Sequence, residues 1–413
     1  MRLLIVSQYF WPETFRVNDL AAELIARGHE VTVLTGVPNY PDGKVFESYR
    51  RDPPAFSSFH GADVLRVPML PRGRGNLSLV ANYLSFVAGG LLRGPAKLKG
   101  RRFDAIFVFQ TSPITSVLPA LWLRRRRGTP VLLWVLDLWP ETLSAIGVVR
   151  SPALLALVGR LVSFIYKRCD RILIQSRAFL ENVARYAGDT HKVRYFPGWA
   201  ETVFSEMGQV EPARELDPFR DDFKLVFAGN IGQAQDFPAL IAAADLLRDV
   251  AGLRWIVLGE GRAGDAARDE VVRRGLTDKV VFLGRYPLER MPSFFAAADA
   301  LLVSLVDQPI WAMTIPGKVQ SYLASGKPLL GMLNGEGARV IDEAGAGLTG
   351  SAGDAAMLAA NVRRLMALAP DERARMGRAG QAYCAREFGR EQSIDRLEQW
   401  IEELQPRGEG GPG

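Results

Sequence analysis

The chain opens with the apolar run Arg2-Leu3-Leu4-Ile5-Val6-Ser7. This run is typical of a buried strand, and Glu30–Thr35 is a second run of the same kind. Between them, Leu20 and Leu24 lie at helical spacing, and Gly28 marks the end of a helix. A strand–helix–strand order of this kind predicts a parallel sheet with helices on both faces.

The second half of the chain repeats this architecture. Its 413 residues are too many for one core, which indicates two or three domains. We expect strands in the second half at Leu225–Ala228, Arg254–Leu258, Val280–Leu283 and Ala300–Leu305, and a further short buried strand that begins at Pro328. The predicted divisions are a first domain at 1–200, a polar linker at 201–222, a second domain at 223–388, a C-terminal helix at 389–405 that returns to the first domain, and a disordered tail at 406–413. Two such α/β domains predict a clamp whose ligand cleft lies between them.

Composition narrows the class of protein. Apolar residues make up 48% and charged residues 23%, as in ordinary globular proteins. Cys169 and Cys384 are far apart and form no CxxC pattern, which favours a reducing compartment and argues against a zinc ribbon or a disulfide scaffold. No secretory signal is expected, because the first apolar run is short and is followed by polar residues and Pro12.

Charge is distributed unevenly. Residues 1–200 hold 27 Lys and Arg against 14 Asp and Glu, whereas the remainder holds 24 against 31. A basic first half suits an anionic partner. No zinc-finger or RNA-recognition signature is present, so we expect acidic lipid or phosphate and no nucleic acid.

Two stretches favour a membrane surface. Asn76–Leu92 has no charged residue over 17 positions and leads into a basic stretch that ends at Arg102, while Leu121–Arg127 ends in four arginines. We expect residues 76–102 and 121–127 to meet anionic head groups. The alternatives are a packed core helix and a solvated helix end favoured by the helix dipole.

The stretch Trp311–Met332 is the first candidate for a ligand site. Pro316 and Gly317 form a turn, Lys318 begins a helical pattern and Gly326 closes it. A lysine beside the free N–H groups of a helix start favours a phosphate. The alternative is an ordinary crossover with an incidental lysine.

A glycine hexad and the ends of two strands supply further candidates. Gly259–Gly264 fits G-x-G-x-x-G, but no acidic residue for a ribose follows the next strand, which argues against NAD; the hexad either admits a phosphate or sugar near Arg262 or is a plain turn. In the first half, Asp137 follows a strand, where it can bind a hydroxyl, orient a nucleophile, act as a base or simply cap the next turn. Glu13, Arg16 and Asn18 belong to the first-strand loop, which is either a site or a solvated loop with a helix cap.

The order of elements and several motifs resemble a known family. The motifs are the first-strand loop, the Gly229 loop, Gly259-Glu260-Gly261 and Ser321–Pro328. Together they resemble the retaining, nucleotide-sugar-dependent glycosyltransferases of family 4, with the GT-B fold. Residues 7–18, 137–141 and 314–328 look most like bacterial fucosamine-type transferases of O-antigen and colanic acid assembly.

The resemblance implies a reaction and a place for it. A UDP-activated deoxyamino sugar, N-acetyl-L-fucosamine, would be added to an undecaprenyl-diphosphate-linked sugar at the inner, cytoplasmic face of the plasma membrane. No cofactor is implied beyond the UDP-sugar donor substrate. No DxD motif is present, so we expect no metal ion. Two alternatives are a sugar-nucleotide epimerase of the same fold and a noncatalytic subunit that binds nucleotide sugars.

The chain departs from the family pattern at its charged donor positions. The usual pair of glutamates eight residues apart is replaced by Met313 and Ser321, and the usual arginine and lysine are replaced by Asn230 and Gln235. We therefore expect Lys318, with Arg262 or Arg285, to stabilise the leaving diphosphate. The uracil would lie near residues 284–286.

The expected site residues follow from these assignments. Asp137 and Lys318 are the expected catalytic residues. The expected donor-binding residues are Gly229, Asn230, Gln235, Glu260, Gly261, Arg262, Arg285, Tyr286, Pro316, Gly317, Lys318, Gln320 and Ser321. The expected acceptor-binding residues are Glu13, Arg16, Asn18, Trp139 and Glu141. No carboxylate nucleophile is obvious, so retention implies attack by the acceptor hydroxyl on the face that the diphosphate leaves.

Overall fold

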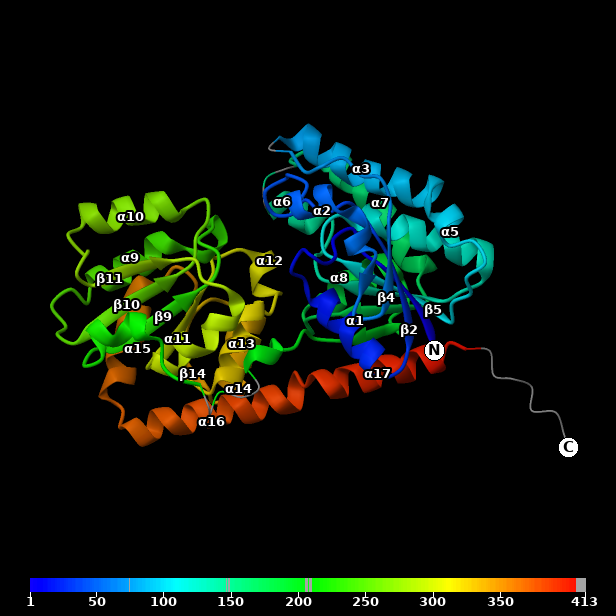
Figure 1. The fold of residues 1–413 in the computed structure, drawn as a ribbon. Coiled ribbons are helices and arrows are strands. Elements are labelled where there is room, and N and C mark those ends of the chain that lie inside the picture. The colour runs from blue at the N-terminus through cyan, green and yellow to red at the C-terminus, as the bar shows by residue number, and fades with distance from the viewer. Residues whose placement is uncertain (74, 146, 148, 205–206, 208–209, 406–413) are drawn as a thin grey trace, which may run out of the picture. The chain divides into compact units, whose positions relative to one another are not determined.

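A computed structural model describes residues 1–405 except 74, 146, 148, 205–206 and 208–209, together with all their side chains but that of residue 76. The chain forms two compact units (Figure 1). Unit 1 comprises Met1–Phe196 and the chain from Glu391 onward, and unit 2 comprises Pro197–Arg390. The tail expected to be disordered, 406–413, lies outside the described residues.

Unit 1 is built on an eight-stranded sheet in the order β3-β4-β2-β1-β5-β6-β7-β8. Its strands are β1 Arg2–Val6, β2 Glu30–Thr35, β3 Ser58–Phe59, β4 Ala62–Arg66, β5 Ala105–Gln110, β6 Val131–Val135, β7 Arg171–Ile174 and β8 Val193–Tyr195. All neighbours pair in parallel except β3 and β4. Strand order reverses at β1, which lies between β2 and β5. In sheets of this kind the switch point, at the carboxyl ends of the strands, is where ligands bind.

Helices connect the strands of unit 1. They are α1 Arg16–Ala26, α2 Glu47–Arg51, α3 Asn76–Leu92, α4 Gly94–Lys97, α5 Leu118–Arg127, α6 Glu141–Ala145, α7 Pro152–Arg168, α8 Phe179–Ala187 and α17 Arg390–Glu402. The last of these packs beside α1. Arg27 bonds Asp395 and Glu398 at 2.5 and 3.0 Å, and the Trp400 ring lies 6.0 Å from that of Phe196.

Unit 2 has a six-stranded, wholly parallel sheet in the order β11-β10-β9-β12-β13-β14. The strands are β9 Phe223–Ala228, β10 Leu253–Leu258, β11 Val280–Gly284, β12 Ala300–Ser304, β13 Leu329–Met332 and β14 Gly347–Gly350. The helices are α9 Phe237–Asp245, α10 Gly264–Arg273, α11 Met291–Ala297, α12 Pro309–Ala312, α13 Gly317–Ser325, α14 Glu336–Glu343, α15 Ala355–Ala367 and α16 Pro370–Glu387. Here the switch point is β9. The prediction of two doubly wound parallel-sheet domains is confirmed.

The segment predicted as a polar linker, 201–222, packs on unit 2 over its described part. Its described part forms two short 3₁₀ helices, Thr202–Phe204 and Arg214–Phe219, that fold onto unit 2. Phe204 and Leu216 are 4% and 2% exposed in the core of that unit, and the Phe204 ring stacks on Phe295 at 5.3 Å. The many acidic residues made this segment look solvent-exposed. A few well-spaced hydrophobic side chains are nevertheless enough to hold a polar segment against a domain.

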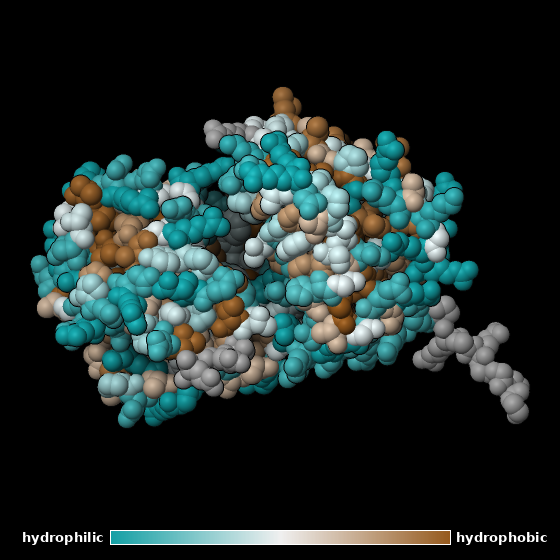
Figure 2. All heavy atoms as spheres, viewed as in Figure 1, coloured by the Kyte–Doolittle hydropathy of each residue, from teal (hydrophilic) through white to brown (hydrophobic). Residues whose placement is uncertain are grey.

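Helix α3 has two different faces. Asn82 and Phe86 are fully buried, whereas Leu77 and Leu92 are 87% and 77% exposed. The buried face is the one that a packed core helix predicts, and the exposed apolar face is the one that the membrane-surface interpretation requires. Figure 2 shows apolar side chains on the surface over α3. Within the described residues, no helix has both the length and the apolar character needed to cross a bilayer.

Candidate functional site

At the carboxyl edge of the unit 1 sheet, three residues from adjacent strand ends are joined by hydrogen bonds. Ser112 follows β5, and Asp137 and Trp139 follow β6. The Ser112 hydroxyl donates to Asp137 Oδ2 at 2.7 Å, and Trp139 Nε1 donates to Ser112 Oγ at 3.2 Å. Asp137 therefore has a fixed orientation. Trp139, expected to bind the acceptor, lies in the same cluster.

Burial and hydrogen bonding act on Asp137 in opposite directions. Burial raises the pKa of its carboxyl group, and the hydrogen bond from Ser112 lowers that pKa. A carboxylate with this environment can accept a proton or a hydroxyl hydrogen bond more readily than an exposed one. Ser112 was not predicted as a site residue, because it contacts Asp137 only when β5 and β6 lie side by side in the folded sheet.

A second polar network lies at the end of β1. Gln8 Nε2 and the Tyr9 hydroxyl donate to Asn82 Oδ1 at 2.9 and 3.3 Å, and Asn82 Nδ2 donates to the carbonyl of Leu70 at 2.6 Å. These residues were not among the predicted site residues. The signal for them was Asn82 itself, a polar side chain in an otherwise apolar helix. Fully buried polar groups of this kind fix local structure because leaving them unpaired is costly.

Glu13 and Asn18 hold the first-strand loop together. Glu13 is 2% exposed, and its carboxylate accepts hydrogen bonds from the backbone N–H groups of Asn39, Tyr40 and Phe10 at 2.8, 2.7 and 3.1 Å. Asn18 accepts from the Trp11 N–H at 3.2 Å and donates to the Glu13 carbonyl at 2.7 Å. Both side chains thus form hydrogen bonds to the backbone of unit 1. Arg16 is the first residue of α1.

Glu141 belongs to a different neighbourhood. Its Oε1 accepts a hydrogen bond from the Tyr186 hydroxyl at 3.2 Å and lies 3.9 Å from Arg185. The structure therefore groups Asp137 with Trp139, and Glu13 with Asn18, while Glu141 faces the α8 side of the same unit.

In unit 2, Lys318 lies in the first turn of α13 and points back onto the sheet. Its Nζ lies 3.6 Å from the centre of the Phe227 ring. This nitrogen is buried, and none of the described residues offers it a hydrogen-bond acceptor. Burial lowers the pKa of Lys318 to about 7. Apart from the Phe227 ring, no described contact compensates this buried amine, and a strongly perturbed pKa in such a place marks Lys318 as a candidate site residue.

Two glycines make room for this lysine. Gly229 has φ +134°, and a Cβ there would lie 2.6 Å from Lys318 Cε. Gly259 has φ +142°, and its Cβ would lie 1.9 Å from the Gly229 carbonyl oxygen. Any other residue would be strained at either position and would collide with a neighbour. The turns after β9 and β10 therefore touch, and Lys318 fits against the first of them.

Tyr322, one turn further along α13, fastens this arrangement. Its hydroxyl accepts from the N–H of Ala228 at 2.9 Å and donates to the carbonyl of the same residue at 3.0 Å. Ala228 is the last residue of β9 and precedes Gly229. Tyr322 thus fixes the start of α13 against the glycine turn. Helical spacing gave Tyr322 as a core residue but did not show this role.

The other expected donor residues fall into two groups. Asn230, Glu260 and Gly261 lie at the touching turns, since Ile231 N–H donates to the Glu260 carbonyl at 2.9 Å. Arg262 and Arg285 are exposed, and no described contact brings them to Lys318.

The remaining expected donor residues are engaged within unit 2. Gln235 caps the Gly232 N–H at 3.0 Å, Ser321 donates to Glu201 at 2.5 Å, and the Tyr286 ring packs on Phe294 at 4.6 Å. Gln320 is buried, and Pro316 and Gly317 form the start of α13.

Comparisons with known proteins agree with this two-unit architecture. Residues 14–199 match the glycosyl transferase 4-like domain family, and residues 222–367 match the glycosyl transferases group 1 family. The probable glycosyltransferase WbjE of Pseudomonas aeruginosa is 26% identical over 67% of this chain and 70% of its own. The putative colanic acid biosynthesis glycosyl transferase WcaI of Escherichia coli is 24% identical over 79% and 82%.

A solved structure shares the fold. The structure of Anabaena HepE in complex with UDP and glucose has a TM-score of 0.68 and 16% identity, covering 98% of this chain and 99% of that one. The chain therefore joins a glycosyl transferase 4-like domain to a glycosyl transferases group 1 domain, and it is a glycosyltransferase with the GT-B fold.

Proposed function

We propose that this glycosyltransferase moves a deoxyamino sugar, N-acetyl-L-fucosamine, from a UDP-sugar to an undecaprenyl-diphosphate-linked saccharide in surface polysaccharide biosynthesis. The likeness to WcaI, a putative colanic acid biosynthesis glycosyl transferase, supports a polysaccharide pathway, and the likeness to WbjE supports sugar transfer. The HepE complex supports a UDP-sugar donor by analogy. We place the protein at the inner face of the plasma membrane as a peripheral membrane protein. The proposed reaction needs neither a cofactor nor a metal ion.

One observation carries the donor assignment. Lys318 Nζ is buried, has no acceptor among the described residues, and lies against the Gly229 turn at the switch point of the unit 2 sheet. A diphosphate there would supply the missing counter-charge. The free N–H groups at the start of α13 would add to the attraction.

The proposed chemistry follows from where charge develops. Breaking the bond between sugar and phosphate leaves negative charge on the diphosphate and positive, oxocarbenium character on the sugar. Lys318 and the helix start stabilise the first of these charges. Asp137 orients the acceptor hydroxyl or the donor sugar and accepts the hydroxyl proton, and the hydroxyl attacks on the face that the diphosphate leaves.

The surface of α3 supports a membrane-bound acceptor. Leu77, Leu84 and Leu92 are 87%, 56% and 77% exposed, and Arg93 and Lys97 follow directly as exposed cations. Apolar side chains beside cations favour the interface of an anionic bilayer.

Two assays test the function. A thermal-shift screen of UDP-sugars should show the largest stabilisation with a UDP-deoxyamino sugar. A transfer assay with lipid-linked saccharide should then yield an elongated lipid. Stabilisation by no UDP-sugar, or hydrolysis and epimerisation without transfer, would contradict the proposal.

Vesicle binding tests the membrane surface. Replacing Leu77, Leu84 and Leu92 by serine should weaken binding to anionic vesicles by at least about tenfold. Full burial of a leucine side chain contributes about 1.5–3 kcal/mol, and partial insertion into the bilayer interface contributes less. The matched control replaces Leu246 and Val272, which are 54% and 65% exposed in unit 2. Equal loss in both variants would argue against a specific membrane face.

A further inference from the structure

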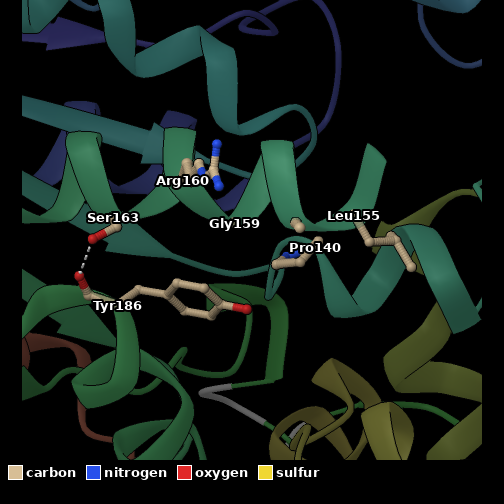
Figure 3. A pocket seen from close by; sticks show the side chains of 7 residues that line it. Pro140, Leu155, Gly159, Arg160, Ser163 and Tyr186 are labelled. Carbon is tan, nitrogen blue, oxygen red and sulfur yellow. Dashed lines mark hydrogen bonds between the residues drawn. The ribbon is translucent and has the colours of Figure 1, made fainter. Parts of the chain in front are cut away.

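A groove in unit 1 lies beside the candidate acceptor site. It has a volume of about 430 Å³, and it runs between α7 and the end of α8, with Pro140 at one end. In Figure 3 the ring of Tyr186 lies along α7 below Gly159 and points toward Pro140. Pro140 is three residues after Asp137, so their Cα atoms are at most about 11 Å apart. A molecule in this groove is therefore close to the proposed catalytic carboxylate.

The lining of the groove suits hydrocarbon. Leu155, Ala156 and Pro140 present apolar atoms, and Gly159 lets the Tyr186 ring lie against the helix, since a Cβ there would be 3.2 Å from Tyr186 Cε1. The two hydroxyl groups of the lining are already engaged. The Ser163 hydroxyl donates to the Tyr186 carbonyl at 2.9 Å, and the Tyr186 hydroxyl donates to Glu141 at 3.2 Å. A saccharide would find few free partners here, whereas an apolar chain needs none.

Charge and surface continuity point to the same kind of ligand. Arg160 is the one charged residue among those that line the groove, and no carboxylate of the described residues pairs with it. On the adjoining face of α7, Leu154, Leu157 and Phe164 are 46%, 59% and 44% exposed. An apolar chain entering from a membrane would thus pass along apolar side chains and find a guanidinium suited to phosphate oxygens.

We propose that the groove between α7 and α8 binds the first isoprene units of a polyprenyl diphosphate acceptor, with Arg160 near its phosphates. The inference rests on the proposed function, because it requires a lipid-linked acceptor. It adds a subsite that selects the acceptor by its lipid chain, separately from the membrane surface of α3.

The test compares acceptors that differ only in lipid chain length, assayed in detergent micelles so that vesicle docking does not limit the rate. The wild-type protein should use a long-chain acceptor at least about tenfold better, in kcat/KM, than one with a single isoprene unit, which is the gain from burying two or three methylene groups. Ala156→Trp fills the groove and should abolish that preference, lowering kcat/KM for the long-chain acceptor by at least about tenfold. Ala156 is exposed, so the larger side chain can be accommodated.

Leu246→Trp is the matched control, because Leu246 is 54% exposed in unit 2, away from the groove and from the apolar side chains of α7; it should keep the preference. A benzophenone-bearing prenyl diphosphate provides a second measurement and should label peptides from α7 and α8. The groove proposal is overturned if the wild type shows no chain-length preference, if Ala156→Trp retains it, or if labelling is confined to α3. Absence of transfer to every lipid acceptor would instead overturn the proposed function, and the groove proposal with it.

Discussion

The carboxyl edges of the two sheets are constructed differently. In unit 1, Ser112, Asp137 and Trp139 form a chain of hydrogen bonds, so the acid is fixed by its neighbours. In unit 2, glycines form the edge, and Lys318 has no hydrogen-bond acceptor among the described residues. The difference is consistent with the two proposed roles. Asp137 is held by a hydrogen bond, as an oriented proton acceptor would be, whereas Lys318 lacks the acceptor that a bound anion would supply.

The largest effect is expected when the glycine edge of unit 2 is filled. Gly229→Ala places a Cβ 2.6 Å from Lys318 Cε at φ +134°, so the lysine must move. UDP affinity should fall by about 100-fold, the scale on which one misplaced charged contact acts. The measurement is a titration of UDP by calorimetry.

Two comparisons sharpen this test. In a protein that already carries Lys318→Ala, adding Gly229→Ala should lower the UDP affinity by a further factor of less than about three, because the lysine side chain that it would displace is absent. Gly275→Ala introduces a Cβ at a positive φ without a close contact, since φ is +66° and nothing lies within 4 Å of its Cβ. If that variant weakened UDP binding equally, the contact between Gly229 and Lys318 would not be the cause.

A smaller effect is expected at the edge of unit 1. Ser112→Ala removes the hydrogen bond that lowers the pKa of Asp137, so that pKa rises. If Asp137 acts as a carboxylate, the acid limb of kcat/KM should move to higher pH, with a loss of about fivefold to tenfold at the acid end. Ser116→Ala is the control, because its hydroxyl bonds only the Pro113 carbonyl, at 2.8 Å. An unchanged pH profile in Ser112→Ala would contradict this role.

The smallest effect concerns the fastening of α13. Tyr322→Phe leaves the N–H and carbonyl of Ala228 without their side-chain partner and should lower the free energy of unfolding by about 1–3 kcal/mol. Urea denaturation measures this change. Tyr166→Phe is the matched control, because its buried hydroxyl has no hydrogen-bond partner among the described residues, and its loss should be nearly neutral. Equal destabilisation would mean that the Ala228 bonds contribute little.

Periodicity and punctuation predicted the fold well because they are local signals. Helix α13 was expected to begin near Lys318 and end at Gly326, and it spans Gly317–Ser325 with Gly326 in the left-handed conformation. The packing of segment 201–222 on unit 2 was not predicted, because its acidic residues outnumber its apolar anchors, such as Phe204.

Residues of the candidate site could be singled out from the sequence only where a single strand end or helix start was enough to mark them. Asp137 and Lys318 each stand out beside a strand end or helix start. Ser112 did not, because its partner comes from the neighbouring strand. Glu13 was expected to bind the acceptor, yet its carboxylate is used by N–H groups 26 and 27 residues further along the chain. Such pairings depend on tertiary structure that local sequence patterns do not contain.

The central claim is that Lys318 receives the donor diphosphate. Burial lowers its pKa to about 7 in the unliganded protein, so at pH 8.5 it is largely neutral, and a bound diphosphate should restore its proton.

Calorimetric titration of UDP at pH 8.5, in two buffers with different ionisation enthalpies, measures this proton directly. We predict uptake of nearly one proton per UDP bound by the wild type. We predict none by Lys318→Met, with affinity lower by about 30-fold or more. Lys327→Met serves as control, since Lys327 follows the same helix and already donates to the Ala296 carbonyl at 2.8 Å. Equal UDP affinity in wild type and Lys318→Met, with no proton uptake in either, would contradict the account.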